Sequence, residues 1–205
     1  MSSIYDRYFS QPRLPLGVMA GHVWETDPRR LGIVLARYKF VAKMLAGLDA
    51  VAEIGCGDGW AGRVVEQAVA HLGRYDADPA MCGESGAALW DITYGPLPGG
   101  RYDAVYALDV LEHIADVDAA LRNMAVSVHK EKGVAIVGMP SMEGQKWASD
   151  DSRAGHVSCM TESELRRHCF RHFNNVFVFG MNDEALHTGF GPMCHYRIAL
   201  CVGPR

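Results

Sequence analysis

The strongest constraint on the fold is a glycine cluster that directly follows a short apolar run. The stretch VAEIGCGDGW, residues 51–60, places Gly55, Gly57 and Gly59 within five residues. Glycine costs backbone entropy, so such a cluster indicates a tight turn or a close approach of the backbone to a ligand. An apolar strand, a glycine turn and a helix together form a pocket in which backbone amides face a ligand at the carboxyl edge of a sheet.

Downstream of residue 49, short apolar runs alternate with helical stretches. Strands are expected at AVAEI, GRYD, AALWD, YDAVYAL and GVAIVGM, and helices at WAGRVVEQAVAHL, around PAMCGE and at DVDAALRNMAVSVHK. This alternation is typical of parallel βαβ units, so the sequence predicts an α/β fold, a three-layer sandwich. Two last strands, NVFVFGM and HYRIALCV, have no helix between them and can therefore pair antiparallel.

The start of the chain is predicted to be irregular. Residues 1–26 mix Tyr, Phe, Pro and Gly without a helical period, which favours an arm or lid over a helix. Its aromatic residues, Tyr5, Tyr8, Phe9 and Trp24, are candidates for substrate capture or for a plain hydrophobic cover. Asp27 and Pro28 then mark a helix start, with the Asp27 side chain as the expected cap, and the helix runs to Gly47.

Two features lie between the fifth strand and the last two. The segment from Pro140 to Ser158 has little periodicity, which predicts a functional or mobile loop and a place for substrate contacts. After it, Thr161 and Glu164 in TESE predict a capping box, and Leu165, Cys169 and Phe173 form a core stripe.

Length and composition indicate one domain, residues 1–205, with a core at 27–205. The net charge of -4 gives no electrostatic reason to expect nucleic acid or an anionic membrane as a partner. Six cysteines without a CxxC pair, and no signal-peptide pattern, favour reduced thiols in a cytoplasmic protein. The oligomeric state is not predictable from these features.

The spacing of the glycines separates two classes of cofactor. Dinucleotide sites use G-x-G-x-x-G, whose amides bind a pyrophosphate, whereas this chain has G-x-G-x-G. Glu53 stands two residues before the first glycine. A carboxylate there would repel a pyrophosphate, but it suits a ligand that carries an ammonium group and a sulfonium.

These motifs resemble the class I S-adenosylmethionine-dependent methyltransferases, whose first motif reads E/D-x-G-x-G-x-G where this chain has EIGCGDG. The segment YDAVYALDVLEHI is similar to the fourth-strand signature of the small-molecule members. The resemblance covers residues 31–202 and implies a Rossmann-like, seven-stranded, mostly parallel sheet of order 3-2-1-4-5-7-6 with an antiparallel C-terminal strand. It also implies S-adenosyl-L-methionine as the cofactor.

The resemblance assigns cofactor contacts residue by residue. Asp76, or Asp78 as the fallback, would bind the ribose hydroxyls; Asp91 would contact the adenine amino group, and Ile92 would cover the ring. Asp76 and Asp91 could alternatively be ordinary strand-end caps. The full set of predicted cofactor residues is Arg37, Glu53, Gly55, Gly57, Gly59, Asp76, Asp91, Ile92 and Asp109. Arg37 is a candidate for the cofactor carboxylate or, equally, a solvated helix arginine.

Histidines are the candidates for a general base, which an oxygen acceptor requires. His113 follows the fourth strand, where the methyl group should lie, although the Glu112–His113 pair could simply anchor a turn. His156 in the long loop and His187 in NDEALHTGF are the next candidates, with a loop held by its own hydrogen bonds as the alternative. A zinc site built from His156, Cys159, His168, Cys169 and His172 is disfavoured, because Cys169 belongs to the core stripe. No metal is therefore predicted.

We expect a methyltransferase that acts on a small polar metabolite, a sugar being one candidate, and at oxygen in preference to nitrogen. The oxygen preference follows from the histidines and from the sequence ALDV, which replaces the N/D-P-P-Y/F tetrapeptide of amino methyltransferases. The alternatives are a protein that binds S-adenosylmethionine without turnover and a pyridine-nucleotide oxidoreductase.

Overall fold

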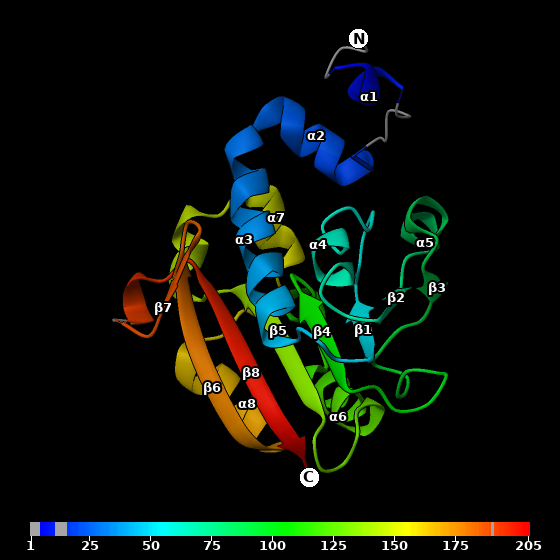
Figure 1. The fold of residues 1–205 in the computed structure, drawn as a ribbon. Coiled ribbons are helices and arrows are strands. Elements are labelled where there is room, and N and C mark those ends of the chain that lie inside the picture. Colours follow the sequence, from blue (N-terminus) through cyan, green and yellow to red (C-terminus); the bar gives the residue numbers. More distant parts are fainter. Residues whose placement is uncertain (1–4, 11–15, 190) are drawn as a thin grey trace.

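The computed structural model describes residues 5–10, 16–189 and 191–205, and its centre is one eight-stranded sheet. The strands are β1 (Ala50–Ile54), β2 (His71–Asp76), β3 (Ala88–Leu89), β4 (Ala104–Leu108), β5 (Val134–Pro140), β6 (Phe173–Asn182), β7 (Ala185–His187) and β8 (Tyr196–Pro204). Their order is β3-β2-β1-β4-β5-β8-β6-β7, and β1 to β5 are mutually parallel (Figure 1). The last strand, β8, pairs antiparallel with both β5 and β6, as expected.

Helices cover both faces of the sheet. The helices are α1 (Asp6–Phe9), α2 (Val18–Thr26), α3 (Pro28–Met44), α4 (Arg63–Glu66), α5 (Pro79–Ser85), α6 (Val117–Ser127), α7 (Asp150–Gly155) and α8 (Glu162–Phe170), with short 3₁₀ turns η1 (Leu111–His113), η2 (Glu143–Trp147) and η3 (Gly191–Met193). One core cluster joins α6 and α8 to the sheet, and a second joins α3 and α4 to the other face (Figure 1). This is the predicted three-layer α/β sandwich, with a Rossmann-like arrangement of strands.

The eighth strand corrects the predicted count of seven. It arises inside the segment that the sequence suggested was only a connection between the last two strands. Asp183 and Glu184 form a two-residue turn between the paired residues Asn182 and Ala185. Asp183 takes a φ of +49°, which short polar residues tolerate in such hairpins.

The N-terminal arm is more regular than predicted, because residues 18–26 form the helix α2. Its apolar residues have little helical periodicity, so its stability comes from packing on α3 and from a cap supplied by a distant residue. Asp58 accepts hydrogen bonds from the amides of Met19 and Ala20, each at 2.9 Å. Residues 1–4 and 11–15 of the predicted arm lie outside the described part of the chain.

Three local predictions also need correction. The helix expected at 60–72 is only α4, because the chain leaves it to begin β2, where the His71 amide donates to Asp49 O at 2.8 Å. Asp27 occupies the N-cap of α3 but makes no side-chain capping bond. The loop from Pro140 to Ser158 contains η2 and α7.

The predicted capping box at the start of α8 is confirmed. Thr161 and Glu164 satisfy each other's backbone amides. Leu165, Cys169 and Phe173 are fully buried, as the core stripe requires.

Candidate active site

The glycine loop after β1 has a backbone that side chains rarely adopt. Gly55, Gly57 and Gly59 have φ values of +70°, +54° and +72°, in the left-handed region that favours glycine. At Gly55 an added Cβ would lie 2.3 Å from Cγ2 of Val110, which follows β4. Glycine is therefore required there for space as well as conformation, and the loop approaches the end of β4 closely.

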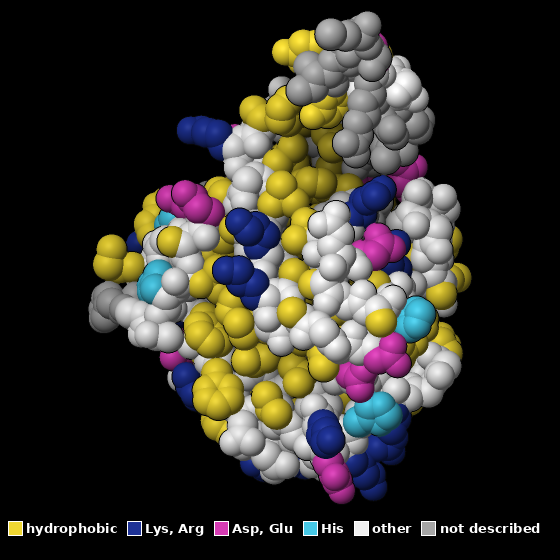
Figure 2. Space-filling view, viewed as in Figure 1, with side chains coloured by type: hydrophobic (Ala, Val, Ile, Leu, Met, Phe, Trp, Pro, Cys, Tyr) yellow, Lys and Arg dark blue, Asp and Glu magenta, His cyan; other side chains and the backbone are white. Residues whose placement is uncertain are grey.

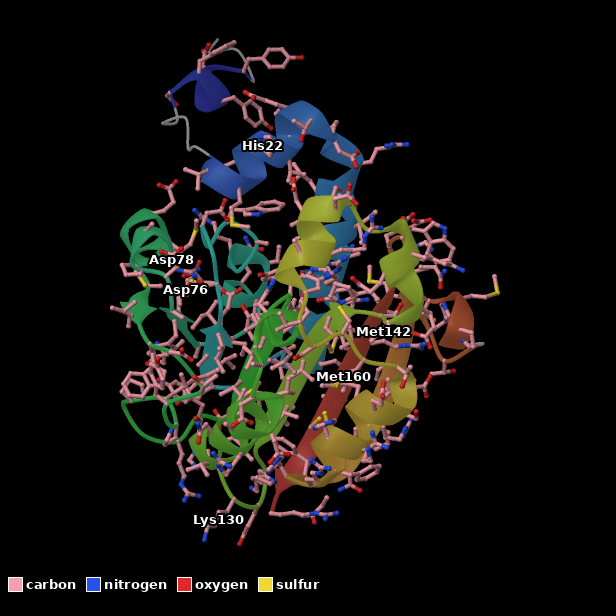
Figure 3. All side chains as sticks on the ribbon, turned by 180° about the vertical axis from the view of Figure 1, so that it is seen from behind. His22, Asp76, Asp78, Lys130, Met142 and Met160 are labelled. Atoms are coloured by element: carbon pink, nitrogen blue, oxygen red, sulfur yellow. The ribbon has the colours of Figure 1, made fainter. Side chains whose placement is uncertain are left out.

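Asp76, the last residue of β2, fastens the glycine loop. Its carboxylate accepts from the Gly57 amide at 2.8 Å and from the Asp78 amide at 2.9 Å. Asp78 caps α5 by accepting from the Ala80 amide at 2.8 Å. Figure 3 shows both aspartates beside α5. Carboxylate oxygens have several lone pairs, so Asp76 can accept a further hydrogen bond from a ligand.

A cavity of about 760 Å³, called the first cavity here, opens at the carboxyl ends of β1, β2 and β4. The predicted cofactor residues that line it are Gly55, Gly57, Asp76, Asp91, Ile92 and Asp109. Met19 of α2 and Asp116, the N-cap of α6, also contribute to its wall. Residues that are far apart in the sequence are thus brought together where parallel sheets bind ligands.

Asp91 and Ile92 form the wall of this cavity beyond β3. Asp91 accepts from the backbone amide and the hydroxyl of Thr93 at 2.8 and 2.7 Å, which fixes its carboxylate. Ile92 is buried, and its carbonyl accepts from the side chain of Asn123 on α6. The wall therefore presents one fixed carboxylate beside an apolar side chain.

Three of the predicted cofactor residues, Arg37, Glu53 and Gly59, are not among the described residues that line the first cavity. Glu53 is 1% exposed and faces α3, where it accepts from the Tyr38 hydroxyl at 2.8 Å. Burial raises the pKa of Glu53 to about 7, and the hydrogen bond from Tyr38 opposes this rise. Glu53 therefore lies beneath the loop, in the core.

Arg37 is engaged with another predicted residue. Its Nη1 donates to both carboxylate oxygens of Asp109, at 2.9 and 2.7 Å, and its guanidinium lies over the Tyr196 ring, 3.7 Å from the centroid. Asp109 has a φ of +57° directly after β4. The pair lies next to the first cavity, and Arg37 also lines a neighbouring cavity described next.

A second cavity, of about 590 Å³, lies between α3, η2 and α7. Its wall includes Arg30, Arg37, Gln145, Trp147, Asp183 and His156. It mixes charged, amide and aromatic groups, which suits a polar ligand. The long loop predicted to contact substrate supplies much of this wall. Figure 2 shows hydrophobic side chains gathered where α2 meets α3.

The candidate bases His113 and His156 are brought together, and His187 is not. The rings of His113 and His156 lie 5.2 Å apart between centroids. His113 lines the first cavity and His156 the second. His187 lies on β7, where its Nε2 is 2.6 Å from Asn182 Oδ1 and its Nδ1 accepts from the Gly189 amide.

The residues weighed for zinc do not form a cluster in the described part of the chain. Cys169 is buried in the core, and His172 is 3.1 Å from Asp118. Instead, Glu112, His113 and His156 bring ligand atoms within 4.8 Å of one another. Sequence reasoning missed this group because Glu112 and His156 are distant in the chain. It also missed the cap that Asp58 provides for α2.

A Rossmann-like sheet with a glycine loop, a carboxylate at the end of β2 and a cavity at its carboxyl edge defines an enzyme class that binds a nucleoside cofactor. Residues 25–174 match the family model described as "Methyltransferase domain", and the chain belongs to that family. It is an S-adenosylmethionine-dependent methyltransferase. No curated protein gave a sequence match. No helix among the described residues is long and apolar enough to cross a membrane.

Solved methyltransferase structures share the fold. A S-adenosylmethionine-dependent methyltransferase from Clostridium acetobutylicum has a TM-score of 0.67 at 10% identity, over 98% of this chain and 99% of its own. The N-methyltransferase NodS from Bradyrhizobium japonicum, solved with S-adenosylhomocysteine, has a TM-score of 0.63 at 16% identity, over 93% and 95%. Magnesium protoporphyrin IX methyltransferase from Synechocystis has a TM-score of 0.58 at 17% identity, over 97% and 92%.

The first cavity fits S-adenosylmethionine on the evidence of its own residues. Its glycine backbone leaves room that a Cβ at Gly57, only 3.2 Å from the Met19 sulfur, would reduce. Asp76 and Asp91 present carboxylates for hydroxyl and amino donors, and Ile92 supplies an apolar surface for a ring. Among the described residues lining it there is no Lys or Arg to bind a pyrophosphate.

Proposed function

We propose that this methyltransferase transfers a methyl group to a hydroxyl oxygen of a small polar molecule, with a sugar-like metabolite as the candidate acceptor. S-adenosylmethionine, when bound, supplies a methyl group on a positively charged sulfur, which is already activated for displacement. The protein must therefore align the acceptor, exclude water and remove the hydroxyl proton.

The residues of the first cavity would hold the cofactor. We assign Asp76 to the ribose hydroxyls, Asp91 to the adenine amino group and Ile92 to the face of the ring. Gly55 and Gly57 leave the loop backbone open beside them. Asp109 and Arg37 lie where the first cavity meets its neighbours, and their mutual ion pair keeps this boundary fixed.

The second cavity would receive the acceptor. Trp147 is largely exposed and offers an aromatic face, while Arg30, Gln145 and Asp183 offer hydrogen-bonding groups in the same wall. An aromatic surface with several polar groups suits a hydroxylated molecule better than a purely apolar one.

One observation carries the choice of oxygen: two imidazoles meet where the two cavities adjoin. The pKa of His156 is lowered, mainly by burial and also by His113, so its ring is neutral near pH 7, as a base requires. His187 already uses both ring nitrogens in hydrogen bonds, which favours His113 and His156 over it.

The test is an acceptor search. The protein is incubated with methyl-labelled S-adenosylmethionine and a fractionated metabolite extract, and labelled products are identified by mass spectrometry. We expect the label as a methyl ether on a polar metabolite. A labelled amine or thiol would refute the oxygen assignment. Tight cofactor binding without release of S-adenosylhomocysteine from any fraction would favour a binding protein without turnover.

A further inference from the structure

Glu112, His113 and His156 form a compact cluster, here called the EHH cluster, between η1 and the segment that follows α7. One potential ligand atom from each side chain lies within 4.8 Å of the other two. The backbone fixes this arrangement, because the amides of Val157 and Ser158 both donate to the Glu112 carbonyl, at 2.7 and 3.1 Å. Two segments more than 40 residues apart are thereby fastened side by side.

Both imidazoles of the cluster are held by their Nδ1 atoms. His113 Nδ1 lies 2.8 Å from Gly155 O, and His156 Nδ1 lies 2.9 Å from Gln145 Oε1. Both partners are oxygen acceptors, so each Nδ1 carries the proton and donates it. In the neutral form of each ring, Nε2 then has the lone pair that a metal ion could bind. Metal-binding histidines are typically oriented in this way, by a carbonyl or carboxylate on the other ring nitrogen.

Glu112 supplies an independent observation. Its side chain is 1% exposed, and its Oε2 has no hydrogen-bond partner among the described residues. Burying a carboxylate without a partner is costly. The nearby cation, Arg37, directs its Nη1 to both oxygens of Asp109. The cluster therefore combines a buried carboxyl group that has an unsatisfied oxygen with two imidazoles that are oriented through Nδ1.

We propose that the EHH cluster binds a divalent transition-metal ion, with Zn²⁺ as the first candidate. Two nitrogens and one carboxylate are a common ligand set for catalytic zinc, with further positions left open, and also suit Fe²⁺ or Mn²⁺. Mg²⁺ and Ca²⁺ prefer oxygen ligands and fit less well. Ligand atoms of a tetrahedral zinc ion lie about 3.4 Å apart, so binding requires the ligand atoms of the three side chains to approach one another by up to about 1.4 Å.

The position of the cluster gives the ion a role. His113 lines the first cavity and His156 the second, so the ion would lie between the cofactor and the acceptor. This role rests on the proposed function. An acceptor hydroxyl on the open position would ionise more easily, and its proton would pass to solvent. The new O–C bond then forms as the S–C bond breaks, leaving neutral S-adenosylhomocysteine and a methyl ether.

The test measures metal binding alone. Protein freed of metal by chelation is titrated with Zn²⁺, and separately with Mn²⁺ and Mg²⁺, by calorimetry; Co²⁺ gives a visible spectrum that reports nitrogen and oxygen ligands. We expect one Zn²⁺ per chain and weaker binding of Mg²⁺. His113→Ala and His156→Ala should each weaken Zn²⁺ binding by about tenfold or more. His195→Ala is the matched control, because His195 lines the second cavity outside the cluster.

Glu112→Gln guards against a folding artefact. It replaces the buried carboxyl by an amide of nearly the same shape, so the metal-free variant should fold with a thermal stability close to that of the parent. Its affinity for Zn²⁺ should nevertheless be lower than that of the parent by about tenfold or more. Zn²⁺ affinity that is equal in the parent and in the three cluster variants would overturn the proposal.

The outcomes separate the metal site from the proposed function. Zn²⁺ binding that depends on the cluster, with no methylated hydroxyl found, would leave the site standing and remove the oxygen assignment. Methylation of a hydroxyl that persists in chelator, with no Zn²⁺ bound by the parent, would refute the metal site. The imidazoles would then act as bases directly.

Discussion

Asp58, in the glycine loop, caps a helix that begins 40 residues earlier: its Oδ2 accepts from the Met19 amide at 2.9 Å, and from the Ala20 amide at the same distance. Met19 in turn lines the first cavity. The glycine loop therefore also fixes the helix that contributes Met19 to the wall of this cavity. This contact joins α2 to the glycine loop, whose residues Gly55 and Gly57 line the first cavity.

Asp58→Ala should loosen α2. A lost N-cap costs about 1 kcal/mol, which corresponds to roughly fivefold more frequent opening of the helix start. Amide hydrogen exchange at Met19 and Ala20 should quicken by that factor. Asp27→Ala is the control at the other end of α2, because the Asp27 side chain caps neither helix. Unchanged exchange in Asp58→Ala would show that packing alone holds α2.

The ion pair between Arg37 and Asp109 should show energetic coupling. Arg37→Met leaves Asp109 without its partner, and Asp109→Asn keeps a residue that tolerates the left-handed backbone. Each change should lower the free energy of unfolding by about 1–2 kcal/mol, a value discounted because Asp109 is partly exposed. Urea unfolding of both single variants and the double variant gives the coupling. Strictly additive losses would mean that the contact contributes nothing.

Asp76→Asn tests the ribose assignment without removing the side chain. The amide offers one oxygen where the carboxylate offers two, so one of the bonds to Gly57 and Asp78 is lost together with an acceptor for ligand. We expect about a tenfold or greater rise in the Kd of S-adenosylhomocysteine by calorimetry.

The control for Asp76→Asn is Asp78→Ala, which removes the cap of α5 at a cost of about 1 kcal/mol in stability. Its effect on affinity should be smaller than that of Asp76→Asn. A stronger effect from Asp78 would transfer the ribose role to that residue, which is the alternative raised by the sequence.

The local signals of the sequence predicted the layers, whereas the strand order came from the resemblance to the methyltransferase family. A short apolar run such as AVAEI, followed by a glycine turn, indicates a buried strand. The capping box of Thr161 and Glu164 can be recognised from only four consecutive residues. The helix α2 was missed because its cap comes from Asp58, which is separated from α2 in the sequence by α3 and β1. Strand β7 was missed because a two-residue turn at Asp183 leaves only a weak local signal.

The site was predictable to the same extent. Gly55, Gly57, Asp76 and Asp91 lie at or just after the carboxyl ends of parallel strands in one sheet, so their convergence at one edge follows from topology. The direction of each side chain does not follow from topology alone. Side chains alternate between the two faces of a strand, and Glu53 lies on the face that packs on α3, where it contacts Tyr38. The meeting of Glu112 with His156 depends on how the loop after β5 folds back, which no local pattern encodes.

Glu53 should make stability depend on pH. Burial raises its pKa from the ordinary value of 4.5 to about 7 in the folded protein, whereas the unfolded chain keeps the ordinary value. Between these values the folded state retains a proton that the unfolded state has lost. The contribution of Glu53 to stability is therefore complete below pH 4.5, falls as the pH rises to about 7, and is constant above that. The total change is on the order of 3 kcal/mol.

Urea unfolding of the parent and of Glu53→Gln between pH 4.5 and pH 8 measures this contribution. The neutral amide still accepts from Tyr38, and its NH₂ group can donate to the Tyr106 hydroxyl, which has no hydrogen-bond partner among the described residues. Glu53→Gln should therefore lose most of the downward slope and exceed the parent in stability at pH 8. Glu66→Gln, which alters the half-exposed partner of Arg74, should keep the slope of the parent. The free energy of unfolding could instead fall in parallel with pH in Glu53→Gln and in the parent. The Glu53 carboxyl would then be ionised over the whole pH range measured, and the core beneath the glycine loop would tolerate its charge.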